Sequence, residues 1–180
     1  MGEEFKFISE SECREIFSAA VENDTKHQET NRALREQNSS NFKDWNLYLR
    51  NDFNLLIHGI GSKKTLLTEF CDTYLSSLPQ VVVLGYLPTL HPKKIIKNIL
   101  TQVYNMKAVP ARLDLQIQAI QRKPIEFVLV VHNIDGIALR TAEAQNLLSS
   151  LAALENVHLI ASLDHIRAEI RMSRFIEYLV

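Results

Sequence analysis

The segment HGIGSKKT, at residues 58–65, contains the residue types with the clearest chemical potential. It follows the short apolar run FNLLIH and precedes a helical pattern, which is the setting of a phosphate-binding loop. Such a loop has the pattern G-x-x-x-x-G-K-[ST], so that backbone amides and a helix start surround the phosphates. Lys64 and Thr65 match its end, but His58 and Lys63 stand where glycines belong. Because a side chain before the lysine obstructs phosphate, we expect a vestigial turn, with retained nucleotide binding as the alternative.

A second candidate site is the end of the apolar run FVLVV at residues 127–131. An active ATPase of this kind needs an acidic residue there to hold magnesium and orient water, whereas this chain has His132 and Asn133. Neutral histidine does not replace aspartate on magnesium, which prefers oxygen ligands, and Asn133 offers one carbonyl but no base. The first carboxylate is Asp135, and we expect Asp135-Gly136 to form a turn. ATP hydrolysis is therefore not expected.

Other residues with chemical potential are less well placed for catalysis. Ser162, Asp164 and His165 have the residue types of a catalytic triad, but such close neighbours in sequence do not converge in the needed geometry. Ser162 instead ends a fourth apolar run, where related ATPases place a group that senses the terminal phosphate. The six histidines show no zinc-binding spacing. We therefore expect no catalytic residue, no metal and no cofactor.

Basic residues gather in the middle of the chain. Residues 51–125 carry 9 basic and 4 acidic side chains, although the whole chain has 20 basic and 21 acidic ones. Lys93, Lys94 and Lys97 cluster at the start of a helical pattern that opens at Pro92. We expect a solvated helix face here, with contact to a nucleic-acid backbone as the alternative.

The order of apolar and helical patterns predicts the fold class. Strand-like runs at 53–58, 81–85, 127–131 and 157–162 alternate with amphipathic helices, at 63–76, after Pro92, after Pro110 and at 142–153. The tail FIEYLV at residues 175–180 is either a fifth strand or a last helical turn. Continuous apolar strands separated by helices indicate a mostly parallel sheet covered on both faces, a three-layer α/β sandwich. We therefore expect a P-loop NTPase-like core over residues 51–180.

A helical N-terminal segment with a polar linker is predicted over residues 1–50. A capping box at Ser9 begins an amphipathic helix over residues 10–22, and residues 22–41 are almost wholly polar. A short helix after Asn41 would then place Phe42 and Trp45 on one side. We expect these two apolar faces either to dock a neighbouring protein or to cover the sheet.

Composition excludes several classes of protein. The 180 residues are 46% hydrophobic and 23% charged, so neither a disordered chain nor an arginine-rich protein is expected. The two cysteines form no C-x-x-C pair, which suits a reducing compartment. No apolar run approaches the roughly 18 residues of a membrane span, and the start MGEEFKFISE lacks the features of a signal peptide. A soluble intracellular protein is expected.

A resemblance to a known family rests on these same segments. From about Phe42 to Ile166 the sequence resembles the second subunit of the eukaryotic origin recognition complex, in the stretches DWNLYLRNDFNLLIHGIGSKKTLLTEF, VVVLGYLP, FVLVVHNIDG and VHLIASLDHI. The block FN-LL-x-x-GIGSKK is the most specific part. The endings HN-I-D and LIASLDH are nearly as specific, because they depart from ordinary ATPases as the family does.

The resemblance implies an AAA+-like core without working nucleotide chemistry, and strand order 2-3-1-4-5. It implies a nuclear scaffold subunit of the origin recognition complex, with the third subunit as nearest neighbour, in a ring that encircles origin DNA and helps to load the helicase. The helix near Lys93 matches a DNA-facing insertion of initiator proteins, and a winged helix is not expected within these residues. The family's degenerate phosphate loop would comprise Gly59, Gly61, Ser62, Lys63, Lys64 and Thr65, and its altered strand ends His132, Asn133, Asp135, Asp164 and His165.

Two other functions stay open from the residues themselves. An active P-loop ATPase or kinase would use Lys64 and Thr65, but would need a substitute for the missing magnesium carboxylate. An autonomous DNA-binding module would account for the basic middle of the chain, although no helix-turn-helix or other reading motif supports it. No membrane association is expected.

Overall fold

A computed structural model describes residue 30, residues 32–59 and residues 61–164. The chain divides into two compact units, Met1–Asn41 and Phe42–Val180. In the first unit residues 32–39 are helical, and Arg32 pairs with Glu36 one turn later at 3.1 Å, an exposed contact worth little. The predicted helix over residues 10–22 and the tail at 175–180 lie outside the described residues. No helix in the described ranges is long and apolar enough to cross a membrane.

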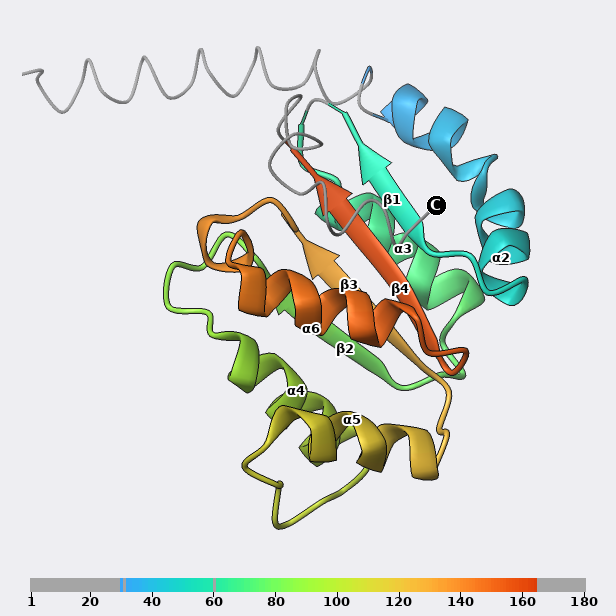
Figure 1. Cartoon of the computed structure of the whole chain (residues 1–180). Coiled ribbons are helices and arrows are strands. Elements are labelled where there is room, and N and C mark those ends of the chain that lie inside the picture. Colours follow the sequence, from blue (N-terminus) through green and yellow to red (C-terminus); the bar gives the residue numbers. More distant parts are fainter. Residues whose placement is uncertain (1–29, 31, 60, 165–180) are drawn as a thin grey trace, which may run out of the picture. The chain divides into compact units, whose positions relative to one another are not determined.

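The described part of the second unit contains a four-stranded parallel sheet (Figure 1). Its strands are β1 (Leu55–His58), β2 (Gln80–Leu84), β3 (Phe127–His132) and β4 (Val157–Leu163), in the order β1-β4-β3-β2. The predicted order, with β1 between β3 and β4, is therefore wrong. The reason lies in burial, since β4 is almost wholly buried while β1 becomes exposed toward His58. A strand inside such a sheet must be covered on both faces, which suits β4.

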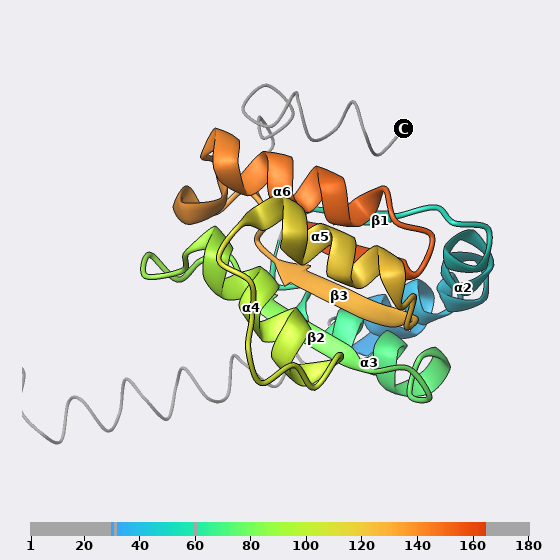
Figure 2. The same ribbon diagram turned by 60° about the horizontal axis from the view of Figure 1, so that its bottom comes forward.

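Helices cover both faces of this sheet (Figures 1 and 2). One face carries α4 (Pro92–Gln102), α5 (Leu113–Arg122) and α6 (Ala142–Ala152), and the other carries α2 (Phe42–Arg50) and α3 (Lys64–Tyr74). The predicted three-layer α/β sandwich is confirmed. Pro110 does not open α5, because the backbone stays extended at Arg112 and the helix begins one residue later.

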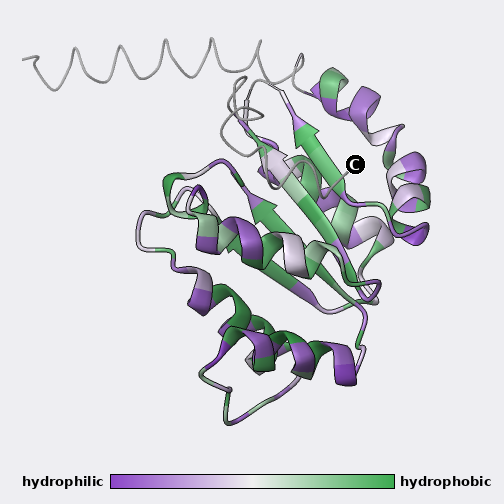
Figure 3. Cartoon of the chain, viewed as in Figure 1, coloured by the Kyte–Doolittle hydropathy of each residue, from purple (hydrophilic) through white to green (hydrophobic). Residues whose placement is uncertain are grey.

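The central strand β3 shows how one apolar run serves two cores. Phe127, Leu129 and Val131 face the core formed with α4, α5 and α6, whereas Val128 and Val130 face the core formed with α2 and α3. Successive side chains of a strand point to opposite faces, and every residue of β3 is buried. Hydrophobic residues accordingly run along much of the strands (Figure 3).

Helix α2 is part of the unit that contains the sheet, whereas the sequence pattern predicts residues 42–50 to belong to the N-terminal segment. The rings of Phe42 and Trp45 each lie within 5.4 Å of the ring of Phe70 on α3, measured between centroids. Phe42 and Leu49 are buried in the same core. Of the two alternatives for this aromatic helix, the structure supports the one in which it covers the sheet.

Candidate functional site

The candidate phosphate loop leaves the carboxyl end of β1 and leads into α3. Gly59 and Gly61 have φ angles of 144° and 90°, in the range that favours glycine. A Cβ added at either position would meet no atom within 4 Å. Backbone conformation, and not lack of space, therefore requires glycine at these two positions.

Lys63 fills this loop with its own side chain. Its Nζ donates hydrogen bonds of 2.8 Å to the carbonyl oxygens of both Gly59 and Gly61. The same nitrogen lies 2.6 Å from Oδ1 of Asp164, which follows β4. Lys63 is only 8% exposed, compared with 46% for Asp164. The ammonium group is therefore held by two carbonyls and a carboxylate, within a loop whose sequence suggests phosphate binding.

This arrangement reverses the polarity of a phosphate-binding loop. A working loop turns backbone N–H groups toward the anion, whereas two carbonyl oxygens of this loop converge on a cation. A phosphate at the same point would face those oxygens and the Asp164 carboxylate. The loop as folded thus holds a positive charge, and the chain supplies that charge itself.

The residues that match the motif best lie outside this arrangement. Lys64 and Thr65 form the first turn of α3 and are both exposed. The hydroxyl of Ser62 accepts a long hydrogen bond of 3.4 Å from the backbone N–H of Lys64. Lys64 therefore lies at the positive end of the helix dipole, in a first turn that contains no acidic residue.

Asn133 joins the loop to the ends of β3 and β4. Its side-chain amide donates to Oδ2 of Asp164, while its backbone N–H donates to the hydroxyl of Ser162 at 3.0 Å. Its φ of 52° is left-handed, a conformation that asparagine tolerates better than most residues. Lys63, Asp164 and Asn133, called the lysine clasp below, therefore tie together the ends of β1, β3 and β4.

The other two residues predicted at the end of β3 are buried. Burial, with a smaller effect from the charge of Lys64, lowers the pKa of His132. The backbone carbonyl of Asp135 accepts a hydrogen bond from Nε of Arg140 at 2.7 Å. His132 has no carboxylate, and Asp135 is buried in the turn that follows β3.

The predicted turn at Asp135-Gly136 is confirmed. The N–H of Gly136 donates to the carbonyl of Asn133 at 2.8 Å. Gly136 packs so closely on Gly85, after β2, that a Cβ on it would lie 2.5 Å from the carbonyl carbon of Gly85. The N–H of Gly85 in turn donates to the carbonyl of His132 at 2.7 Å. The turn that contains Gly85 and the turn that contains Gly136 thus cross in direct backbone contact, beside the lysine clasp.

The predicted lysine cluster lies on another element. Lys93, Lys94 and Lys97 are exposed on the first turns of α4, whose start is capped by the side chain of His91, which accepts from the N–H of Lys93. Within the described ranges, no three histidine, cysteine, aspartate or glutamate side chains come close enough to hold a metal ion.

Sequence reasoning missed the pairing of Lys63 with Asp164. Both were singled out separately, one as an obstruction and the other as part of a strand-end motif. The available signal was that Asn133 and Asp164 each follow an apolar strand, since the carboxyl ends of neighbouring parallel strands share one edge of a sheet. His165 lies outside the described residues.

Comparison with known proteins supports the resemblance. A family model described as the origin recognition complex subunit 2 RecA-like domain matches residues 30–176. Origin recognition complex subunit 2 of Drosophila melanogaster is 33% identical over 158 residues, which cover 84% of this chain and 26% of the fly protein. The mouse protein is 36% identical over 140 residues, covering 75% of this chain and 24% of its own length. The chain thus spans about a quarter of the length of these relatives.

Solved structures agree with the sequence comparisons. The structure of Drosophila ORC bound to DNA contains a chain with a TM-score of 0.74 and 32% identity, over 82% of this chain and 89% of that one. A chain in the structure of Drosophila ORC bound to AT-rich DNA and Cdc6 has a TM-score of 0.78 and 29% sequence identity, over 96% of this chain and 60% of that one. The Aeropyrum pernix ORC1 protein, at 16% identity and a TM-score of 0.57, shares the fold. The chain therefore belongs to the origin recognition complex subunit 2 family, and residues 30–176 carry the RecA-like domain of that family.

Proposed function

We propose that this chain is a non-catalytic core of an origin recognition complex subunit, which helps to assemble a ring on origin DNA in the nucleus, for replication initiation and helicase loading. The observation that carries the non-catalytic part is the ammonium group of Lys63 inside the phosphate loop. A loop that is filled by its own cation has no room at that point for the phosphates of a nucleotide.

Each of the other parts of an ATPase site is also altered. Hydrolysis needs a loop that surrounds phosphate, a lysine that reaches it and an acidic strand end that holds magnesium. Here the loop carbonyls point inward, Lys64 is exposed, and β3 ends in His132. The alternative of an active ATPase or kinase that uses Lys64 and Thr65 would require the loop and Lys64 to rearrange, and would need a substitute for the missing magnesium carboxylate.

The assembly role is supported by the relatives. The related solved structures are those of Drosophila ORC bound to DNA, and bound to DNA and Cdc6. We propose that this chain likewise works among other origin recognition complex subunits, with the third subunit as its nearest neighbour. The lysine clasp would keep the strand ends in one arrangement without a bound nucleotide.

Calorimetric titration of the purified chain with ATP and magnesium tests the non-catalytic role, alongside the variants Lys64→Ala and Asp164→Asn. We expect no binding heat and no phosphate release from the wild-type chain or from Lys64→Ala. Asp164→Asn, which removes the carboxylate partner of Lys63, shows whether opening the clasp admits nucleotide. ATP binding by the wild-type chain that Lys64→Ala abolishes would refute the proposal.

The exposed lysines of α4 support a direct contact with DNA as part of the same role. Lys93, Lys94 and Lys97 lie within one and a half turns, and the first turn of α4 has no acidic residue. Each phosphate contact contributes about 0.9 to the slope of log affinity against log salt. The triple change to glutamine, in the assembled complex, should lower that slope by about two to three units. An unchanged slope would limit these lysines to a solvated surface.

A further inference from the structure

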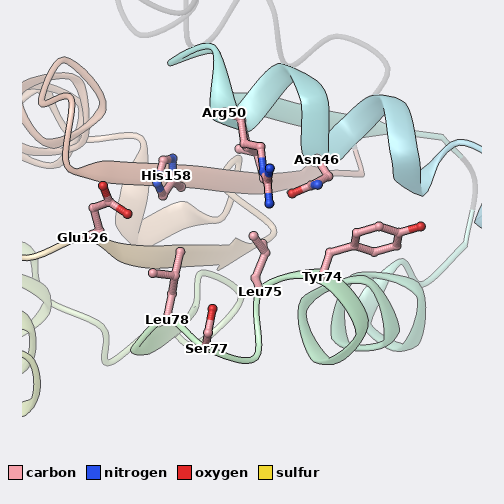
Figure 4. A pocket seen from close by; sticks show the side chains of 9 residues that line it. Asn46, Arg50, Tyr74, Leu75, Ser77, Leu78, Glu126 and His158 are labelled. Atoms are coloured by element: carbon pink, nitrogen blue, oxygen red, sulfur yellow. The ribbon is translucent and has the colours of Figure 1, made fainter.

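Figure 4 shows a hollow of about 260 Å³. It lies at the amino ends of β3 and β4, whereas the lysine clasp lies at the carboxyl ends of the strands. Its walls come from the carboxyl-terminal ends of α2 and α3 and from the starts of β3 and β4. Arg50 points into it from α2, and His158 and Glu126 stand on the strand side. Leu75 and Leu78 line it from the segment after α3.

The charged groups of this hollow have no partner within the described part of the chain. Neither the Arg50 guanidinium nor the Glu126 carboxylate makes a hydrogen bond or ion pair with a described residue. The same holds for the His158 ring. Arg50 lies in the last turn of α2, where a cation suits the helix dipole. That position explains its charge, but not why its side chain turns toward a lined hollow.

The size of the hollow limits what could occupy it. Pockets for small molecules and cofactors usually span about 300–1,000 Å³, and this one is smaller. It suits a single side chain with its neighbouring backbone. Leu75 and Leu78 provide an apolar wall for the methylene groups of such a side chain, and Arg50 lies at the polar end of the hollow.

The charges select a carboxylate in preference to a phosphate. A guanidinium binds a carboxylate through two parallel hydrogen bonds. Glu126 on the opposite side and the negative dipole ends of α2 and α3 would repel a dianion more strongly than a single negative charge. The Glu126 carboxylate can accept hydrogen bonds from peptide N–H groups. A single negative charge accompanied by N–H donors therefore fits this hollow best.

We infer that this hollow is a docking site for an acidic side chain, glutamate in particular, carried by an extended segment of a partner protein. Arg50 pairs with the carboxylate, Leu75 and Leu78 contact the methylene groups, and Glu126 accepts a backbone N–H of the segment. This goes beyond the proposed function, because it neither uses the phosphate loop nor depends on how that loop treats nucleotide.

The test follows backbone amide shifts of the isotope-labelled full chain by NMR. The probes are the acetylated tripeptide amide Leu-Glu-Leu, its Leu-Gln-Leu counterpart and inorganic phosphate. The glutamate peptide should cause saturable shifts centred on Ser77, Leu78 and His158, and the glutamine peptide should bind roughly tenfold more weakly, since it lacks the charge-assisted pair. Arg50→Gln should abolish the difference between the peptides. Lys43→Gln, on α2 but outside the hollow, should preserve it.

Three results would overturn the inference. The first is no localised shift with the glutamate peptide, and the second is equal binding of both peptides. The third is shifts from phosphate as strong as those from the peptide, which would make the hollow a simple anion site. A melting curve of Arg50→Gln that matches the wild type confirms that any loss reflects the contact and not unfolding.

Discussion

Gly136 lies where two turns cross, and its replacement with alanine tests how tightly the strand ends are held. A Cβ there would lie 2.5 Å from the carbonyl carbon of Gly85, and closer still to the oxygen of that carbonyl. Real Cβ atoms keep at least 3.0 Å, and backbone atoms cannot turn aside as a side chain can. The two turns would therefore have to separate.

The cost of that separation follows from the contacts at the crossing. The backbone hydrogen bonds of Gly136 to Asn133 and of Gly85 to His132 both lie there. Overpacking of a close contact costs about 1–3 kcal/mol, and a weakened hydrogen bond adds about 1 kcal/mol. A total of about 2–4 kcal/mol would lower the melting temperature by roughly 4–16 °C in a domain of this size.

Thermal unfolding followed by circular dichroism measures this effect, with Ile137→Ala as the matched control. Ile137 is the next residue and is 77% exposed, so its truncation should change stability by no more than about 0.5 kcal/mol. The reasoning fails if Gly136→Ala melts with the wild type, or if Ile137→Ala loses as much stability. Either result would mean that the two turns can separate at little cost in free energy.

Three further predictions concern single groups. Burial, with a smaller effect from the Asp72 carboxylate, raises the pKa of the Cys71 thiol to about 11, so a thiol reagent at neutral pH should label Cys71 only after denaturation. Thr141→Ala removes the side-chain cap of α6 and should cost about 1 kcal/mol of unfolding free energy in a urea titration. Burial lowers the pKa of His132, so the unfolded chain takes up that proton at higher pH than the folded chain. The stability that neutral His132 contributes is therefore lost as pH falls below about 6.5, and His132→Gln should show a smaller drop in melting temperature between neutral and mildly acidic pH than His58→Gln, an exposed control.

The sequence predicted the strands well because their burial is local in origin. The run FVLVV is apolar at every position, and β3 is buried at every position on two faces. The order of the strands could not be predicted in the same way. Periodicity says which residues face a helix layer, but not which strand lies beside which, and β1 in fact pairs only with β4 among the described strands.

The candidate site was predicted only in part, for a related reason. Its three components follow β1, β3 and β4, and lie up to 101 positions apart in the chain, from Lys63 to Asp164. The sequence shows that each of these residues differs from the one expected in a working ATPase. Such a difference indicates which function is lost, but not which contact the new side chain makes. The pairing became visible when the sheet brought the strand ends together.

The clasp also explains how the loop is stabilised with a lysine at the position where the motif has a glycine. Carbonyl oxygens that turn into such a loop need a hydrogen-bond donor, which the oxygens of an ionised phosphate cannot supply. Lys63, placed where the glycine belongs, provides a partner for the carbonyls of Gly59 and Gly61. Asp164 then balances the charge that this brings into the loop. The Lys63 side chain thus both obstructs phosphate and forms the ion pair that stabilises the loop. Lys63 and Asp164 should therefore be varied together as well as singly.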